Sequence, residues 1–234
     1  DDEIKNSIVK KYPYSRWVKS NILPLSKIPY IVKKSPKEKL NFETRLKIFG
    51  YTKEDFKTII LPMCNNGKEA IGSMGTDTPL AVLSKKPQLI YNYFKQLFAQ
   101  VTNPPLDGIR EEIITDTSLS LGSDYNIFNL IPDHAKKLKI NNPIISNGDL
   151  EKIKYIDHED FKACSINANY EISKGHNGLE KALDMIVDKV EKKVDNNHNI
   201  IILSDRKTSK KYAPIPILLV CSYVHHSLIK RNKR

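Results

Sequence analysis

The clearest hydrophobic pattern lies in the last third of the chain, where strand-like and helix-like periods follow one another. Residues 161–166 alternate between apolar and polar side chains and residues 199–203 form a short apolar run, so both segments are predicted strands. Between them, apolar residues recur every three or four positions, which predicts a long helix with one apolar face. These positions are Leu179, Leu183, Ile186, Val187, Val190 and Val194. A second helix is predicted for residues 214–229. Strand, helix, strand and helix at this spacing indicate parallel βα repeats and an α/β fold.

The first 38 residues are predicted to form an irregular N-terminal arm or linker. Prolines interrupt every candidate helix in this stretch, because proline lacks a backbone N–H and clashes with the preceding helical turn. These prolines are Pro13, Pro24, Pro29 and Pro36. Residues 39–234 are then predicted to form one α/β domain.

Two helices are predicted at the start of this domain. Residues 42–49 form the first, which ends at Gly50. Thr52 is a predicted N-cap with Asp55 at the third helical position, and the second helix runs to about Asn65 before Gly67 stops it.

Shorter apolar runs predict further elements. Residues 80–83 are a candidate buried strand, residues 143–145 are another, and Ser146 is a candidate cap for a helix through residue 156. Pro87 is predicted to open a helix whose apolar stripe belongs to the core. That stripe consists of Leu89, Ile90, Tyr93, Phe94, Leu97 and Phe98. A loop is expected near residues 122–126.

The net charge of +11 raises the question of a nucleic-acid partner. Of the 38 basic residues only six are arginines, and the lysines are spread along the whole chain. Arginine supplies the forked donors that phosphate sites favour, whereas lysine is a solvated point charge. We therefore expect a solvated basic surface and no nucleic-acid partner. No apolar run reaches the ~18 residues that span a bilayer, so no membrane association is expected either.

The cysteines and the known catalytic motifs give little support for chemistry in this chain. Cys64, Cys164 and Cys221 are widely spaced with no C-x-x-C pair, which favours an intracellular, reducing compartment over a disulfide framework or a metal site. No nucleophile elbow, Walker loop or dinucleotide fingerprint is present. We therefore assign no catalytic, cofactor-binding or metal-binding residue.

Two loops rich in glycine and proline bracket the predicted helix after Pro87 and are the first candidate sites. The glycines of the first loop allow close backbone approach, and its hydroxyl and carboxyl groups can bond neighbouring amides. Its candidate residues are Gly72, Ser73, Met74, Gly75, Thr76, Asp77 and Thr78. In the second loop, Asn103 and Arg110 flank a rigid turn that is either an ordinary capped turn or a docking surface.

A third candidate site follows the predicted strand at residues 199–203. Parallel sheets carry their working loops at the carboxyl ends of the strands, and Asp205 and Arg206 occupy that position. They either dock a neighbouring domain or close the loop as an Asp–Arg pair.

Several long segments closely resemble one known family. The segments GKEAIGSMGTDTPLAVLS (67–84) and YFKQLFAQVTNPPLDGIREE (93–112), followed by ILSDR (202–206) and APIPILLVCSYVHHSLI (213–229), are similar in order and content to the central domain of the glutamate synthase large chain. The resemblance covers roughly residues 40–230 and is looser over residues 113–160.

The resemblance implies a role inside a larger enzyme. Glutamate synthases convert glutamine and 2-oxoglutarate to two glutamates, with an amidotransferase domain that releases ammonia and an FMN-binding domain that also holds a 3Fe-4S cluster. The resemblance implies that this chain is the central scaffold between those two domains of the same polypeptide, is inactive alone and holds no cofactor. It also implies a degenerate TIM-barrel-like fold, a place for residues 72–78 near the ammonia route, and a cytoplasmic or plastid location.

Three alternatives stay open from the residues alone. A stand-alone flavin- or phosphate-binding α/β domain would bind FMN. A basic nucleic-acid-binding module would show salt-dependent binding. An interaction domain of another assembly would co-purify with an unrelated partner.

Overall fold

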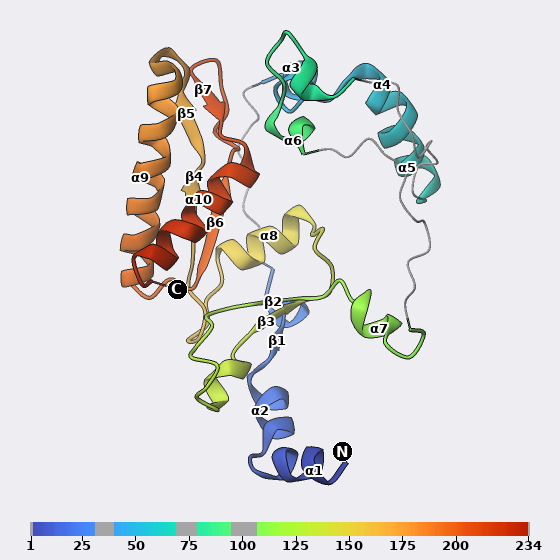
Figure 1. Ribbon diagram of the computed structural model, residues 1–234, viewed down its shortest axis with the longest axis vertical. Coiled ribbons are helices and arrows are strands. Elements are labelled where there is room, and N and C mark those ends of the chain that lie inside the picture. The colour runs from blue at the N-terminus through green and yellow to red at the C-terminus, as the bar shows by residue number, and fades with distance from the viewer. Residues whose placement is uncertain (1, 31–39, 69–78, 95–106, 234) are drawn as a thin grey trace. The chain divides into compact units, whose positions relative to one another are not determined.

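The computed structural model describes residues 2–30, 40–68, 79–94 and 107–233. The contacts divide the chain into two compact units, one formed by residues 1–35 with 113–234 and the other by residues 36–112. Figure 1 labels their helices and strands. The boundary predicted between residues 38 and 39 differs from this division and stays a prediction.

A parallel βα repeat forms one half of the larger unit. Strand β4 (Ala163–Asn167) leads through a second, short strand into helix α9 (Gly175–Asp195), which returns to strand β6 (Ile200–Ser204). β4 and β6 pair in parallel, with Ala163 beside Ile200 and Asn167 beside Ser204. Helix α10 (Ile217–Lys230) follows. The predicted succession of two strands and two helices is confirmed.

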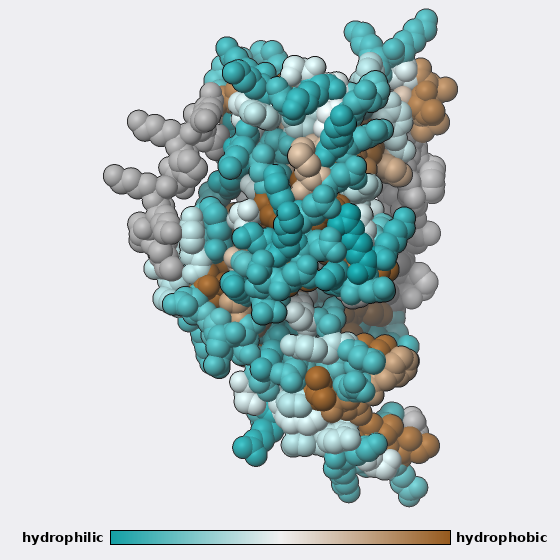
Figure 2. All heavy atoms as spheres, turned by 90° about the vertical axis from the view of Figure 1, so that its left-hand side faces the viewer, coloured by the Kyte–Doolittle hydropathy of each residue, from teal (hydrophilic) through white to brown (hydrophobic). Residues whose placement is uncertain are grey.

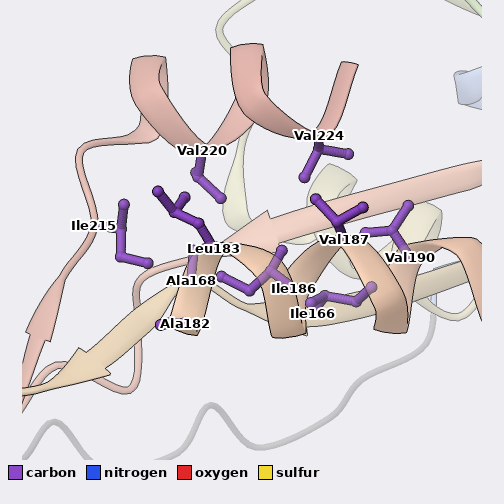
Figure 3. Packing of buried hydrophobic residues seen from close by; sticks show 10 residues of the cluster. All are labelled: Ile166, Ala168, Ala182, Leu183, Ile186, Val187, Val190, Ile215, Val220 and Val224. Atoms are coloured by element: carbon purple, nitrogen blue, oxygen red, sulfur yellow. The ribbon is translucent and has the colours of Figure 1, made fainter. Parts of the chain in front are cut away.

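The side chains between these strands and helices form the first core cluster. Val190 and Val220 are 0% exposed and Val187 is 1% exposed, so the face where α9 meets α10 is closed to solvent. In Figure 3, the valines of α10 extend toward the apolar stripe of α9. The buried members are Ile166, Ala168, Ala182, Leu183, Ile186, Val187, Val190, Ile215, Val220 and Val224. Burial of this stripe holds α9 and α10 on one face of the β4–β6 pair, because apolar area removed from water is the main stabilising contribution.

A short antiparallel pair of strands extends the carboxyl ends of these strands. Strand β5 (Asn169–Glu171) pairs with strand β7 (Tyr212–Pro214). The backbone N–H of Ala168 donates to Ser204 O at 2.8 Å and that of Ile215 donates to Ala168 O at 2.9 Å, so the antiparallel pair is bonded directly to the end of the parallel pair.

The other half of the larger unit is a three-stranded sheet in the order β1-β3-β2. Strand β1 (Leu23–Pro24) runs parallel to β3 (Leu138–Ile140), and β2 (Leu119–Leu121) runs antiparallel to it. Together with helix α8 (Asn147–Lys154) this sheet encloses the second core cluster. Its buried members are Leu25, Ile28, Leu138, Ile140, Ile153, Phe161 and Ile200.

The prediction of an irregular arm at the N-terminus is wrong for most of its described residues. Residues Asp2–Lys10 form helix α1, Tyr14–Asn21 form α2, and Leu25–Lys27 form the 3₁₀ turn η1. Pro13 stands at the N-cap of α2, where its missing N–H costs no helical bond, and Pro24 lies in β1, an edge strand. The prolines begin or flank elements here instead of breaking them.

The smaller unit contains short helical segments. Its described elements are α3 (Phe42–Ile48), α4 (Lys53–Asp55), the π-helical η2 (Phe56–Ile60), α5 (Leu61–Asn66), the 3₁₀ turn η3 (Ala81–Leu83) and α6 (Ile90–Tyr93). Asn41 caps α3 through a bond from Thr44 N–H at 2.9 Å. Thr52 and Asp55 form a complete capping box, and Gly67 ends α5 with a φ of 60°. The helix starts and stops predicted here are confirmed.

Two predictions from short apolar runs are corrected. Residues 80–83 are not a buried strand: Ala81–Leu83 form η3, and Val82 is 72% exposed. Residues 143–145 form no strand, and Ile144 is 90% exposed. Runs this short fit a strand and a helical turn equally well, so the contacts made in the fold decide between them.

The helix predicted after Pro87 is confirmed only in part. It begins at Ile90 and is described to Tyr93; residues 95–106 lie outside the described residues. Leu89 and Ile90 are half-buried, but Tyr93 is 49% exposed and Phe94 is 71% exposed, so the predicted core stripe is wrong at those two positions.

The remaining described elements are helix α7 (Glu111–Ile114) and two 3₁₀ turns, η4 (Pro132–Ala135) and η5 (Ile172–Lys174). The loop expected near residues 122–126 is confirmed. Helices and small parallel sheets make the chain a mixed α/β structure. The described strands form three separate sheets, and none of these closes into a barrel.

Candidate functional site

The three candidate sites differ in what the structure describes. The glycine-rich loop at residues 72–78 and Asn103 lie outside the described residues. Arg110 is described: its side chain is 74% exposed and its Nε lies 3.8 Å from Asp107 Oδ2. An exposed pair of this kind contributes little to stability, so the docking role predicted for Arg110 stays a prediction.

The loop after β6 is held by a small network around the main chain of Asp205. The Asp205 carbonyl accepts a hydrogen bond from Thr208 Oγ1 at 2.6 Å and a longer one from Asn169 Nδ2 at 3.4 Å. Asn169 Nδ2 also donates to Thr208 Oγ1 at 2.9 Å. Residues from β5 and from the loop after β6 are thereby fixed to each other at the carboxyl end of the parallel pair.

This network fixes the orientation of the Asn169 amide. The hydroxyl proton of Thr208 is used on the Asp205 carbonyl, so Thr208 Oγ1 can only accept from Asn169 and the NH₂ group must face it. The Oδ1 atom then points elsewhere, and it finds no partner among the described residues; Asn167 Oδ1 is in the same situation. Asn169 is 8% exposed, so the carboxyl end of β4 carries buried acceptors without donors.

Arg206 links the loop after β6 to the start of α8. Its Nη2 donates to Asn147 Oδ1 at 2.9 Å, and both side chains are exposed. The Asp–Arg pair considered from the sequence is therefore wrong, since the guanidinium reaches another element and not Asp205. The structure brings Asp205 and Arg206 to the expected place at the end of a strand.

The first turn of α8 is stabilised electrostatically. Ser146 caps the helix by accepting from the Asp149 N–H at 3.0 Å, as predicted, and its hydroxyl donates to Asp149 Oδ2 at 2.8 Å. The hydrogen bond from Lys152, followed by that from Ser146, lowers the pKa of the Asp149 carboxyl. A carboxylate in the first turn also interacts favourably with the helix dipole.

Polar pairs join α9 to α10 along their outer edge. Tyr223 donates to Asp184 Oδ1 at 2.6 Å, which raises the pKa of the Tyr223 phenol. Arg231 donates to Asp188 Oδ1 at 3.0 Å and to Glu191. Lys233 donates to Asp195 Oδ1 at 2.5 Å. These contacts place the end of α10 beside the end of α9.

The basic charge is mixed with acidic charge on the face that carries α9. Figure 2 shows this face as largely hydrophilic. The exposed charged residues of α9 have both signs: Glu180, Lys181, Asp184, Asp188, Lys189, Lys192, Lys193 and Asp195. A phosphate-binding surface would gather positive charge on one face, and this helix does not do so.

The described residues contain no group of three or more His, Cys, Asp and Glu side chains that could hold a metal ion. Cys64 and Cys221 are exposed and Cys164 is half-buried, and all three are free thiols. Burial raises the pKa of the Cys164 thiol. A hollow of about 330 Å³ is lined by residues 156–162 with Asn197, and one of about 540 Å³ by Pro13 and residues of α2. Among the helices described, none is long and apolar enough to cross a membrane.

The sequence analysis missed the residues that organise the loop after β6. Asn147, Asn169 and Thr208 lie 22 to 61 positions apart in sequence and meet only through the sheet and its crossover. One signal was available: Asn167 and Asn169 continue a predicted strand with polar side chains at the end where parallel sheets carry their sites.

Comparison with known proteins gives a consistent family. The family model described as the glutamate synthase central domain matches residues 44–234. The NADPH glutamate synthase large chain of Bacillus subtilis is 37% identical over 237 residues, which cover 100% of this chain and 15% of that protein. The NADH glutamate synthase of Schizosaccharomyces pombe is 32% identical over 100% of this chain and 12% of its own length. The chloroplastic ferredoxin-dependent enzyme of Spinacia oleracea is 35% identical over 99% of this chain and 14% of its own.

The family-model match over residues 44–234 contains all four segments that carry the resemblance. It also contains both strands of the parallel pair and the loop with Asp205 and Arg206. The chain spans only 12–15% of the length of these three relatives. It is one part of a much longer kind of polypeptide, and it belongs to the glutamate synthase central domain family.

Proposed function

We propose that this chain is the central scaffold of a glutamate synthase, between a glutamine amidotransferase domain and an FMN-binding synthase domain of the same polypeptide. The observation that carries the proposal is the family match over residues 44–234 within relatives that are glutamate synthases. The chain corresponds to 15% or less of the length of those proteins, which supports a role that depends on the rest of the polypeptide.

The proposed scaffold has no catalytic activity by itself. The described residues offer no metal-ligand cluster, and the three free cysteines are widely spaced in the sequence, without the close spacing of an iron–sulfur cluster run. We assign FMN and the 3Fe-4S cluster to the neighbouring domain, and the oxidoreductase activity to the whole enzyme. A reducing intracellular compartment, cytoplasm or plastid, belongs to the same proposal.

A degenerate TIM-barrel-like arrangement is the proposed architecture of the complete domain. The crossover from β4 through α9 to β6 supports it, because a strand–helix–strand unit with parallel strands is the repeat of such barrels. The parallel pairing of β1 with β3 adds a second parallel pair in the same unit.

The proposed contribution to chemistry is support of ammonia transfer. Ammonia released from glutamine must reach the synthase site without meeting bulk water, where it is protonated and lost as a nucleophile. The loop at residues 72–78 is the proposed contact with this route, since its glycines allow close approach and Asp77 can bond loop amides.

The test is Asp77→Ala in the parent enzyme. We expect glutamine hydrolysis to continue while glutamate formation from glutamine falls several-fold, and activity with added ammonia to fall less. Asp107→Ala is the matched control, because Asp107 is a loop aspartate within the described residues, and its Oδ1 accepts a hydrogen bond from the Ile109 N–H at 3.0 Å. In the control, any loss should affect both half-reactions and thermal stability together. If Asp77→Ala shows the same pattern, the proposed role in ammonia transfer is wrong and only a structural role is left.

We also propose that the basic surface has no nucleic-acid partner. Several of its cations are engaged with acidic side chains of the same chain, including Lys136 with Asp133 and Asp160, each at 2.9 Å. Binding of duplex DNA should be weak and disappear as salt rises. Sequence-selective binding at physiological salt would overturn this part of the proposal.

A further inference from the structure

Strands β2 and β3 are joined by a loop, residues 122–137, that holds two large apolar side chains in solvent (Figure 1). They lie at the centre of a turn at residues 126–129, which we name the apolar turn. Ile127 is 75% exposed and Phe128 is 87% exposed. A single exposed apolar side chain needs no explanation, whereas adjacent ones form a patch of the kind that marks an interaction site.

Hydrogen bonds fix the conformation of the apolar turn. The Asn129 N–H donates to Asn126 O at 2.9 Å, which closes a four-residue turn with Ile127 and Phe128 at its centre. The Asn126 side chain adds a second bond, since its Oδ1 accepts from the Phe128 N–H at 3.0 Å. A turn that is fixed before binding loses little conformational entropy when a partner covers it.

Both flanks of the apolar turn are tied to the body of the larger unit. His134 Nε2 lies 2.8 Å from Asn129 O, and this nitrogen carries the ring proton because a carbonyl oxygen can only accept. The His134 ring also meets the Tyr125 ring edge to face, with 5.7 Å between centroids. On the other flank, Lys137 Nζ donates to Asp124 Oδ1 at 2.5 Å and to two carbonyls of the same loop. The turn η4, which contains His134, packs on α2.

The segment around the apolar turn carries no charged side chain. Residues 125–132 include no Asp, Glu, Lys or Arg, in a chain in which 28% of the residues are charged. The acidic side chains on either side are paired, Asp124 with Lys137 and Asp133 with Lys136, the latter at 2.9 Å. A partner surface can therefore cover the turn without burying an unpaired charge, provided that it is itself apolar and uncharged.

The size of the apolar turn indicates where its partner belongs. A buried aromatic side chain removes about 150–250 Å² from water, so Phe128 and Ile127 together remove roughly 300 Å². A stable contact between separate molecules buries about 800 Å² on each of them. A contact as small as this turn persists when both sides belong to one polypeptide, because the linkage holds them at high effective concentration. This chain covers 15% or less of the length of its relatives, so such a polypeptide has other domains to supply the partner.

We propose that Ile127 and Phe128 insert into an apolar, uncharged pocket on another domain of the same polypeptide, and that the apolar turn thereby fixes the β1-β3-β2 sheet to that domain. The proposal rests on the proposed scaffold role, because it requires neighbouring domains, and it names one contact of that scaffold. It does not depend on ammonia transfer: the turn can dock in an enzyme in which Asp77→Ala leaves the two half-reactions coupled.

The first test measures the exposure of position 127 in the intact parent enzyme. Ile127→Cys introduces a thiol in the apolar turn, and Ile144→Cys is the matched control, since Ile144 is 90% exposed in a different loop. We expect iodoacetamide to label the thiol at position 127 at least 10-fold more slowly than in the urea-unfolded enzyme, with the labelled peptides identified by mass spectrometry. The thiol at position 144 should lose less than threefold.

A smaller decrease at position 127 would show an open turn and overturn the proposal. Protection that disappears when the enzyme is diluted would assign the pocket to a second copy and would also overturn it.

Truncation of Phe128 gives an independent test. Phe128→Ala removes an exposed ring but keeps the N–H that bonds to Asn126, so the turn itself should stay intact. We expect trypsin to cut the native parent enzyme between its domains at least fivefold faster in Phe128→Ala. Phe128→Leu, which keeps a large apolar side chain, and Ile144→Ala should stay within twofold of the parent. Cleavage of Phe128→Ala at the parental rate would contradict the proposal, because the ring would then contribute nothing to holding the domains together.

Discussion

Replacing Arg206 with alanine separates a docking role from a role inside this chain. The bond from its Nη2 to Asn147 Oδ1, at 2.9 Å between two exposed side chains, is the one side-chain hydrogen bond of Arg206 among the described residues. A hydrogen bond contributes about 0.5–1.5 kcal/mol, and exposure to water places this one at the low end. If this bond is the whole role of Arg206, the free energy of unfolding should fall by about 0.5 kcal/mol.

A guanidinium that also docks a neighbouring domain should cost more to remove. Truncating one member of a desolvated charged pair at an interface costs about 2–5 kcal/mol, because the partner group is left buried and unpaired. We expect the docking role, so Arg206→Ala in the parent enzyme should lower glutamate formation from glutamine several-fold while glutamine hydrolysis persists. Asn147→Ala should leave both half-reactions within twofold of the parent.

The double variant completes the cycle and supplies the refuting result. If docking is real, Arg206→Ala still lowers coupling when Asn147 is already alanine, since the two effects are then separate. If Arg206→Ala has no further effect on stability or on either half-reaction in the Asn147→Ala background, its entire contribution passes through Asn147. The docking assignment of Arg206 would then be withdrawn.

Three other predictions concern stability and reactivity. Ile215 lies in the first core cluster and is 1% exposed, so Ile215→Ala should lower the free energy of unfolding by about 2–5 kcal/mol. Ile172 is 48% exposed, and Ile172→Ala should lower it by less than about 0.5 kcal/mol. Equal losses of the two variants in urea denaturation would contradict the packing. The pKa of the Asp149 carboxyl is lowered in the folded chain, so its ionisation stabilises the fold at pH values above the ordinary pKa of 3.8, and this stabilisation is lost as pH falls through the folded-state pKa. Amide exchange in the first turn of α8 should therefore accelerate in acid, and it should accelerate less in Asp149→Asn. Iodoacetamide at pH 8 should label the exposed Cys221 before Cys164, whose thiol pKa is raised by burial, and the reverse order would refute this prediction.

The predictions that held rest on local chemistry. The stripe from Leu183 to Val190 repeats at the helical period over several turns, so it predicts α9 and its buried face without knowledge of any partner. Ser146 and the pair Thr52–Asp55 cap their helices through residues three positions away, and such bonds are encoded within one turn. The family resemblance also follows from contiguous sequence, and the match over residues 44–234 agrees with it.

The predictions that failed rest on contacts between distant segments. Pro24 is compatible with β1 only because β1 lies at the edge of a sheet whose central strand, Leu138–Ile140, comes more than 100 residues later. The run at residues 80–83 has too few residues for a period to decide its conformation, and its surroundings in the fold made it a 3₁₀ turn.

The sequence by itself determined the helices with long periods and caps, the parallel βα repeat and the position of Asp205 and Arg206 at the end of a strand, because each depends on residues within a few turns or one crossover. Only the tertiary structure decided that Arg206 reaches Asn147, that Thr208 orients the buried amide of Asn169, and that the apolar strand β6 pairs with β4 alone among the described strands. These features depend on which distant segments lie side by side, and a hydrogen bond or a strand pairing between such segments leaves no periodic mark in the sequence.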